Sequence, residues 1–264
     1  MVAMKLRRLT TIFAPLLVAG CAPLPEAPET LDELVVYFYE NHDAEDPLVL
    51  AAGVTAFSAW VEEHGDALEE KYEISQLSEE TVDNLDDQDR DTRGLIGLAV
   101  ITESVHSVDD AAFANTAVSI EDVYGDTYSE VERTVVGDTD CFLAVECATL
   151  EAEERYLATF APGVTSRSHL WNQYVWAESE SLRAYQQRNW ILEKPEVSQQ
   201  SLDVDFSFYL NVFLPKDGGG HWRLQSTWMV ATQSGVDPDV ALNVTGNSMR
   251  SSSGDLDDWI TNNL

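Results

Sequence analysis

The apolar residues of this 264-residue chain follow three different patterns. A short apolar run occupies residues 9–20, and a spacing of three to four residues follows it in the segment 31–93. From about Gly94 onward, apolar and polar residues alternate with a period of two. A period near 3.6 predicts helices and a period of two predicts strands, so we expect helices first and a sheet after them.

The clearest alternation lies toward the end of the chain. Apolar residues occupy the even positions of 202–214, polar residues occupy most of the odd ones, and the even pattern resumes from Trp222 to Val230. The glycine-rich segment 215–220 between them supplies the backbone freedom that a turn needs. These residues predict a long antiparallel hairpin with one buried face.

Alternating stretches separated by turn residues predict further strands at 94–104, 117–124, 128–136, 153–160, 169–178 and 182–193. Helices are expected before and after these strands. Thr30 and Asp46 are good N-cap residues for two helices, and Ser78 for a shorter one. The last helix begins at Asp237 and Pro238, with a kink or break expected at 251–254.

These elements predict an α+β fold. N-terminal helices are followed by a long-stranded antiparallel sheet or half-barrel, which a C-terminal helix closes. The helices and an acidic loop occupy 31–93, and the sheet with its helix occupies 94–264.

The apolar run at 9–20 is shorter than the roughly 20 residues that a bilayer span needs. With Lys5, Arg7 and Arg8 before it, the run is typical of a signal peptide. The residues LVAGC at 17–21 resemble the bacterial lipobox at every position. The resemblance implies that 1–20 is removed and that Cys21 is lipidated. The alternative is an ordinary secretory signal that happens to contain a cysteine.

Residues 21–30 contain three prolines and form a stiff, polar tether behind Cys21. Ala22 follows the cysteine, which in lipoproteins of this kind favours the outer membrane over the inner one. The sequence therefore predicts a protein of the cell envelope that is lipid-anchored on the periplasmic face of the outer membrane.

The charge of the chain excludes one class of partner. The formal net charge is −32, and removal of Lys5, Arg7 and Arg8 with the signal lowers it to −35. So acidic a surface repels nucleic acid, and we expect no such partner.

Acidic residues are concentrated in the segment 62–93. Asp87, Asp89 and Asp91 stand at alternate positions, as the first ligands of a calcium loop do. However, Thr92 stands where such a loop needs glycine, and Leu98 stands where it needs glutamate. A solvated acidic loop is therefore the default interpretation and a calcium site the weaker one. The sequence predicts no other metal and no cofactor.

Three stretches carry a resemblance to a known superfamily: RNWIL at 188–192, the pair FSFYLNVFLP and WRLQSTWMVA, and SGVDPDVALNV before the last helix. Together they resemble the START-like helix-grip superfamily. The resemblance implies a curved sheet around the last helix, with an apolar cavity between them for a lipid or another hydrophobic ligand. The START loops after the first helix are not recognisable, and Gly246 and Gly254 weaken the last helix.

Large aromatic residues in the late strands are candidates to line such a cavity. The six candidates are Trp176, Trp190, Phe206, Phe208, Trp222 and Trp228. Core packing is the alternative interpretation, and we regard it as the stronger one.

Cys141 and Cys147 remain as a pair once Cys21 is lipidated. Because disulfides persist in an oxidising compartment, we expect these two residues to be bonded rather than free thiols.

No catalytic motif is present. The five histidines are scattered, and the chain contains neither His-Glu-x-x-His nor Gly-x-Ser-x-Gly. The sequence favours a membrane-anchored lipoprotein that binds a hydrophobic ligand and is not an enzyme. The alternatives are an envelope structural or assembly lipoprotein that acts through protein contacts, its partner unknown, and a hydrolase with a noncontiguous site.

Overall fold

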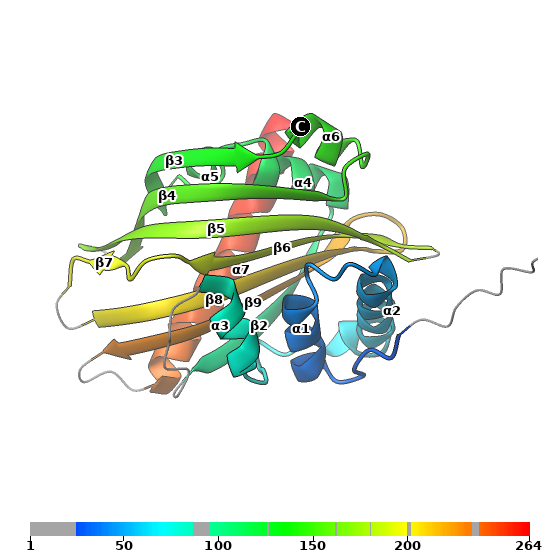
Figure 1. Ribbon diagram of the computed structural model, residues 1–264, viewed down its shortest axis with the longest axis horizontal. Coiled ribbons are helices and arrows are strands. Elements are labelled where there is room, and N and C mark those ends of the chain that lie inside the picture. Colours follow the sequence, from blue (N-terminus) through cyan, green and yellow to red (C-terminus); the bar gives the residue numbers. More distant parts are fainter. Residues whose placement is uncertain are drawn as a thin grey trace, which may run out of the picture.

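The computed structural model describes residues 25–86, 95–125, 127–161, 163–179, 181–199, 202–233 and 238–264. Figure 1 shows one large sheet with helices on both of its faces. The predicted α+β fold is confirmed, with N-terminal helices, long antiparallel strands that short helices interrupt, and a long helix last. None of the helices described is long and apolar enough to cross a membrane.

The N-terminal helices begin where the capping residues predict. α1 spans Leu31–Glu40 and begins directly after Thr30. α2 spans Pro47–His64, and the Asp46 carboxylate accepts a hydrogen bond of 3.0 Å from the Leu48 amide. The pair is followed by a short 3-10 helix at Gly65–Ala67, by β1 at Tyr72–Glu73 and by α3 at Glu79–Asp86.

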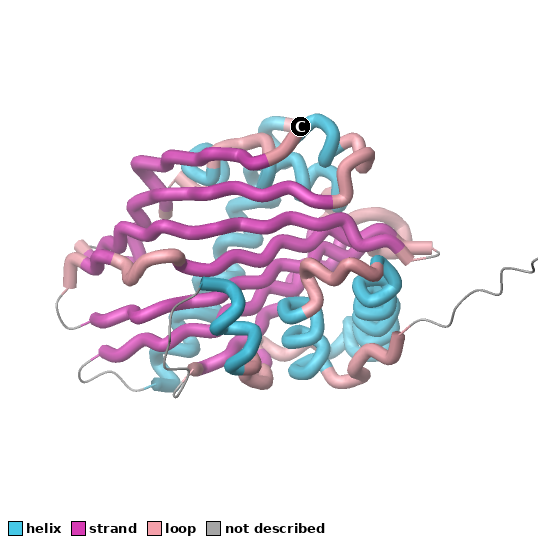
Figure 2. The backbone as a smooth tube through the Cα atoms, in the orientation of Figure 1, coloured by secondary structure: helices cyan, strands magenta, loops and turns pink. Residues whose placement is uncertain are grey.

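The sheet is antiparallel and open, with the strand order β1-β2-β9-β8-β6-β5-β4-β3 and the short β7 beside β5. Figure 2 shows these strands as one continuous, twisted layer. The longer strands are β2 (Ile96–Ser104), β3 (Tyr128–Val136), β4 (Thr149–Ala161), β5 (Val164–Glu178), β6 (Arg183–Ile191), β8 (Leu202–Pro215) and β9 (His221–Gln233), and β7 is Glu196–Val197.

The predicted hairpin is β8 and β9. Its register pairs Phe208 with Trp228 and Val212 with Leu224, so the even-numbered residues of both strands share one face. The connecting turn contains three glycines with positive φ, of which Gly220 lies against β2. A Cβ on Gly220 would collide with the Ser104 carbonyl oxygen, which explains why glycine is needed there.

The two faces of the sheet pack against different helices. The face that we call the outer face packs against α1, α2 and α3 and includes Trp190, Leu210 and Trp228 in its core. The other face, which we call the inner face, packs against α4 (Val108–Thr116), α5 (Ile120–Val123), α6 (Thr139–Leu143) and α7 (Pro238–Asn263). In Figure 1, α1 and α2 lie in front of the strands, and α7 crosses behind them.

Two expectations about the elements were wrong. The segment 117–124 is not a strand, because Ser119 precedes the one-turn helix α5 and the Tyr124 amide closes that turn onto the Ile120 carbonyl. The last helix does not break at 251–254, since α7 is helical from Pro238 to Asn263. Its Ser252 and Ser253 hydroxyls bond to the Met249 carbonyl and so satisfy their polar groups within the helix.

The predicted disulfide between Cys141 and Cys147 is present, with 5.3 Å between the two Cα atoms. It links α6 to the turn that follows this helix, and Phe142 between the two cysteines is fully buried against the inner face. The Trp176 indole donates a hydrogen bond of 2.8 Å to the Phe142 carbonyl. The disulfide therefore constrains a loop that covers one end of the inner face.

Candidate functional site

Four of the six aromatic residues that were expected to line a cavity lie on the outer face. Trp190, Phe208 and Trp228 are buried there, and Trp222 packs against the same cluster. The Trp228 ring lies 5.2 Å from that of Tyr39 in α1. They lie there because side chains alternate along β8 and β9, and the even-numbered ones face the N-terminal helices. These four side chains fill that core and do not face α7.

The remaining candidates divide between the inner face and the part of the chain that is not described. Trp176 lies on the inner face, with its ring 5.7 Å from Phe142 and 5.6 Å from Tyr185. The side chain of Phe206 is outside the described residues, as are Cys21 and the calcium candidates Asp87, Asp89 and Asp91.

The middle of the inner face is polar, which the sequence pattern does not indicate. Because side chains alternate along a strand, the odd positions of β8 and β9 face the same side as α7. Six residues from six neighbouring strands form a set that we call the polar row. It consists of Arg133, Glu154, Asn172, Gln187, Asn211 and Arg223.

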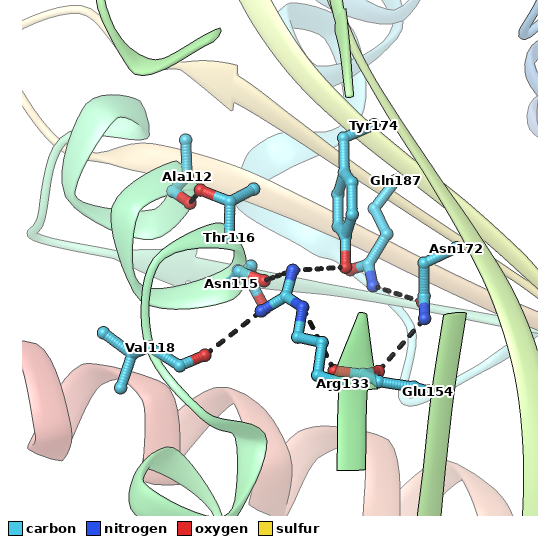
Figure 3. Close-up of polar contacts among 9 residues, drawn as sticks. All are labelled: Ala112, Asn115, Thr116, Val118, Arg133, Glu154, Asn172, Tyr174 and Gln187. Carbon is cyan, nitrogen blue, oxygen red and sulfur yellow. Dashed lines mark hydrogen bonds and ion pairs between the residues drawn. The ribbon is translucent and has the colours of Figure 1, made fainter. Parts of the chain in front are cut away.

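Arg133 of β3 anchors the first half of the polar row (Figure 3). Its guanidinium donates to the Asn115 and Val118 carbonyls, each at 3.2 Å, and to the Tyr174 hydroxyl at 3.0 Å. It also pairs with the Glu154 carboxylate at 3.5 Å. Arg133 thus connects the edge strand to the end of α4 and the loop after it, and its charge lies at the inner face.

The row continues from Glu154 across the central strands. The Asn172 amide donates to Glu154 at 3.0 Å, and the Gln187 amide donates to the Asn172 oxygen at 3.2 Å (Figure 3). The Asn211 amide donates to Gln187 at 3.4 Å, and Arg223 donates to the Asn211 oxygen at 3.2 Å. A chain of polar contacts therefore crosses the sheet from β3 to β9.

Arg223 connects the row to α7. Its guanidinium donates to the Ser252 carbonyl at 3.3 Å and to the Ser253 hydroxyl at 3.4 Å. Ser253 also accepts a hydrogen bond of 2.9 Å from Thr102 of β2. The helix is thus held to the sheet by polar contacts here, whereas Leu256 and Ile260 hold it by apolar contacts farther along.

Burial changes the acid–base properties of the row. Loss of solvation raises the pKa of Glu154, although Arg133 and Asn172 oppose this by stabilising the carboxylate. Only 4% of Glu154 is exposed. A buried carboxylate costs free energy unless it is paired and hydrogen-bonded, and Glu154 has both kinds of partner.

Four tyrosines lie beside the row. Burial raises the pKa of the Tyr124, Tyr128 and Tyr156 hydroxyls, so these three remain neutral at physiological pH. The Tyr128 ring lies 6.0 Å from that of Tyr124 and 4.8 Å from that of Tyr156. Tyr209 of β8, the fourth, is close enough to influence the titration of Tyr128 and Tyr156.

Part of this polar surface remains accessible to solvent. Tyr209, Asn211, Gln187 and Asn189 lie in the central strands β6 and β8, yet each is only partly buried. Their side chains point to the inner side, so this accessible surface lies on the side of the sheet that α7 crosses. In an interface formed by packing alone, residues at these central positions would be fully covered.

A separate hollow of about 570 Å³ lies beside α1 and is lined by residues 26–30, Glu33 and Tyr37. It lies on α1 and the segment before it, not between the sheet and α7. It therefore does not correspond to the cavity that the START-like resemblance implies.

Neither His169 nor His221 contacts a side chain that could act as a nucleophile among the described residues. His169 bonds to the Glu153 and Glu193 carboxylates at 2.7 and 3.1 Å on the outer side of the sheet. His221 is buried, and its Nδ1 lies 2.8 Å from the His106 carbonyl oxygen. No serine or cysteine lies within hydrogen-bond distance of either imidazole among the residues that the structure describes.

No family model matches the chain, and no curated protein matches its sequence. Several solved structures are similar in shape. A START superfamily protein from Mycobacterium smegmatis gives a TM-score of 0.43 at 6% identity, over 64% of this chain and 99% of that one. A STAR-related lipid transfer protein from Xanthomonas axonopodis gives 0.43 at 11% identity, over 65% and 96%. The human StarD13 lipid transfer and protein localization domain gives 0.38 at 10% identity, over 77% and 95%.

Likeness at this level assigns neither a family nor a ligand to this chain. The class of protein is defined instead by its own architecture, which is an open antiparallel sheet with a long C-terminal helix across one face. Its candidate site is the partly accessible polar surface between that helix and the sheet.

Proposed function

We propose that this chain is a small-molecule-binding protein of the bacterial cell envelope, anchored through a lipid on Cys21. Its ligand binds between the inner face and α7. The observation that carries the proposal is the polar row, which lies under a helix at the centre of a sheet and is still reached by solvent at Gln187 and Asn211.

The inner face offers two kinds of contact to a ligand. Phe142, Trp176, Tyr185 and Phe213 form an apolar, aromatic end that α6 and α4 cover. The polar row supplies hydrogen-bond donors and acceptors a few residues away along the same strands. Ligand pockets typically combine mostly apolar walls with a few placed polar groups. The arrangement favours an amphipathic ligand over a purely hydrophobic one.

The test is a titration with 11-(dansylamino)undecanoic acid, a fluorescent amphipathic probe, followed by competition with lipids extracted from the producing cells. We expect saturable binding by the wild-type protein. Gln187→Phe places a ring in the middle of the inner face and is expected to weaken binding by about tenfold or more, because the added volume occupies the site.

Thr134→Phe is the matched control, since it adds the same ring at an exposed position of the edge strand. It is expected to leave binding unchanged. Absence of saturable binding by the folded wild-type protein, together with a ligand-free mass by native mass spectrometry, would overturn the proposal and favour an envelope protein that acts through protein contacts.

A further inference from the structure

The charges in the polar row are not balanced. The row contains two guanidinium groups and one carboxylate, and Glu154 pairs with Arg133 at 3.5 Å. Arg223 makes no ion pair within 4.0 Å with any residue that the structure describes. Only 5% of Arg223 is exposed. A buried charge without an opposite charge is costly, and such groups are usually paired.

Among the described residues, the atoms that accept hydrogen bonds from the Arg223 guanidinium are all neutral. The guanidinium donates to the Asn211 side-chain oxygen, and to the Ser252 carbonyl and the Ser253 hydroxyl of α7. Its Nε–H is buried and has no hydrogen-bond partner among the described residues. The Asp257 carboxylate of α7 instead accepts a hydrogen bond of 2.6 Å from Ser104. Arg223 therefore has a positive charge without an ion-pair partner and an Nε–H donor without an acceptor among the described residues.

Neutral hydroxyl donors lie close to this guanidinium. The Tyr124 hydroxyl is near enough to bond to Arg223, and Tyr128 and Tyr209 lie within electrostatic range of the same group of side chains. A guanidinium beside phenolic hydroxyls can bind a carboxylate or a phosphate through several charge-assisted hydrogen bonds. An anion would also place an opposite charge within ion-pair distance of Arg223, where no described residue does so.

We propose that Arg223 binds an anionic group of the ligand, so that the ligand class is an amphipathic acid with one carboxylate or phosphate on an apolar body. This inference rests on the proposed function. The apolar body lies along Phe213, whose ring is 5.2 Å from the Arg223 guanidinium carbon, toward the aromatic end of the inner face.

The experiment compares three probes that share one alkyl chain: decanoate, decyl phosphate and decanol. Isothermal titration with the wild-type protein is expected to show that an acid binds at least about tenfold more tightly than the alcohol, because hydrogen bonds to charged groups contribute more than neutral ones. The relative affinities of decanoate and decyl phosphate then identify the anion.

Arg223→Gln is expected to remove this preference, so that the acids bind no more tightly than decanol. Arg223→Lys keeps the charge and is expected to retain part of the preference, which also covers the case in which the glutamine variant does not fold. Arg155→Gln, an exposed arginine on the outer side of the sheet, is the control and is expected to change nothing.

The possible failures are distinguishable. Equal binding of acid and alcohol by the wild-type protein overturns the anion inference and leaves the proposed function intact. A preference that survives in folded Arg223→Gln overturns the assignment to Arg223. If neither these probes nor the dansylated probe binds, the proposed function fails and this inference fails with it.

Discussion

His42 and His221 are buried on opposite faces of the sheet, and both are held in the neutral form. Burial lowers the pKa of His42 well below its usual value near 6.5, and the nearby Arg188 charge lowers it further. Burial also lowers the pKa of His221, against the opposing hydrogen bond to the His106 carbonyl. Both imidazoles therefore resist the protonation that an unfolded chain would undergo at mildly acidic pH.

The free energy of unfolding should decrease below pH 6.5 because of His42. In that range the unfolded chain binds a proton at this position and the folded chain does not, so stability falls as pH falls. The loss is at most about 1.4 kcal/mol per pH unit for one such group. Urea unfolding at pH 7.5 and pH 5.5 measures it, and His42→Gln is expected to show a smaller difference between the two pH values than wild type.

His64→Gln serves as the comparison because His64 is exposed at the end of α2. Its pH dependence should match that of wild type. If His42→Gln and wild type lose the same free energy between these pH values, His42 is not held neutral by burial.

At the scale of elements, the turn between β8 and β9 is fixed by glycine for two different reasons. Gly218 and Gly220 both have positive φ, of 86° and 83°. A Cβ at Gly218 would meet nothing within 4 Å, whereas one at Gly220 would collide with the backbone of Ser104 in β2. The two positions therefore separate the cost of the backbone conformation from the cost of a steric collision.

Gly220→Ala should destabilise the protein more than Gly218→Ala. Both variants carry the cost of a positive φ, about 1 kcal/mol, and only Gly220→Ala must also move β2 away from the hairpin. Urea unfolding of the two variants measures the difference. Equal losses of stability would contradict the close approach of this turn to β2.

Much of the architecture could be predicted from the sequence because local signals determine it. The parity of 202–214 predicts the hairpin register, and Asp46 with Pro47 predicts the start of α2. The helix α4 was missed although Ser107 and Asp110 form a capping box, whose Ser-x-x-Asp spacing is visible in the sequence. Segment 117–124 was assigned to a strand because alternation over a few residues does not distinguish a strand from one helical turn.

The candidate site could not be predicted in the same way. The polar odd positions of β8, such as Asn211, have the alternation of a strand with one solvated face. In the structure α7 lies over that face, and a helix distant in sequence leaves no local signal of the side that it covers. A recognisable signal did exist in the polar residues of the long, central strands, namely Asn172, Gln187, Asn211 and Arg223. A solvated strand face is uncommon in a sheet that helices cover on both sides.

At the scale of the whole molecule, the chain forms three layers. The N-terminal helices cover the outer face, the sheet lies in the middle, and α4 to α7 cover the inner face. The tether predicted at 21–30 leads into α1, so an anchor at Cys21 would attach the molecule through its outer-face layer. The candidate site belongs to the opposite layer.

Cys21→Ser should release the protein from membranes. Without the thiol no acyl chain can be attached, and each buried methylene of such a chain contributes about 0.8 kcal/mol to membrane binding. We expect the wild-type protein in the membrane fraction after detergent-free lysis and the variant in the supernatant. The double variant Cys141→Ser, Cys147→Ser should fractionate like wild type, and retention of Cys21→Ser in the membrane would contradict lipid anchoring.

The polar row also has a consequence for how the sheet assembles. Side chains alternate between faces, so a slip of one residue in any strand of the row would move its polar residue from the inner to the outer face. For β9, whose outer side packs against α1, this would place Arg223 in the apolar outer-face core, at the cost of an unpaired buried charge. The row thus disfavours misregistered sheets during folding, and it specifies the pairing of strands that their apolar residues alone would permit in several alignments.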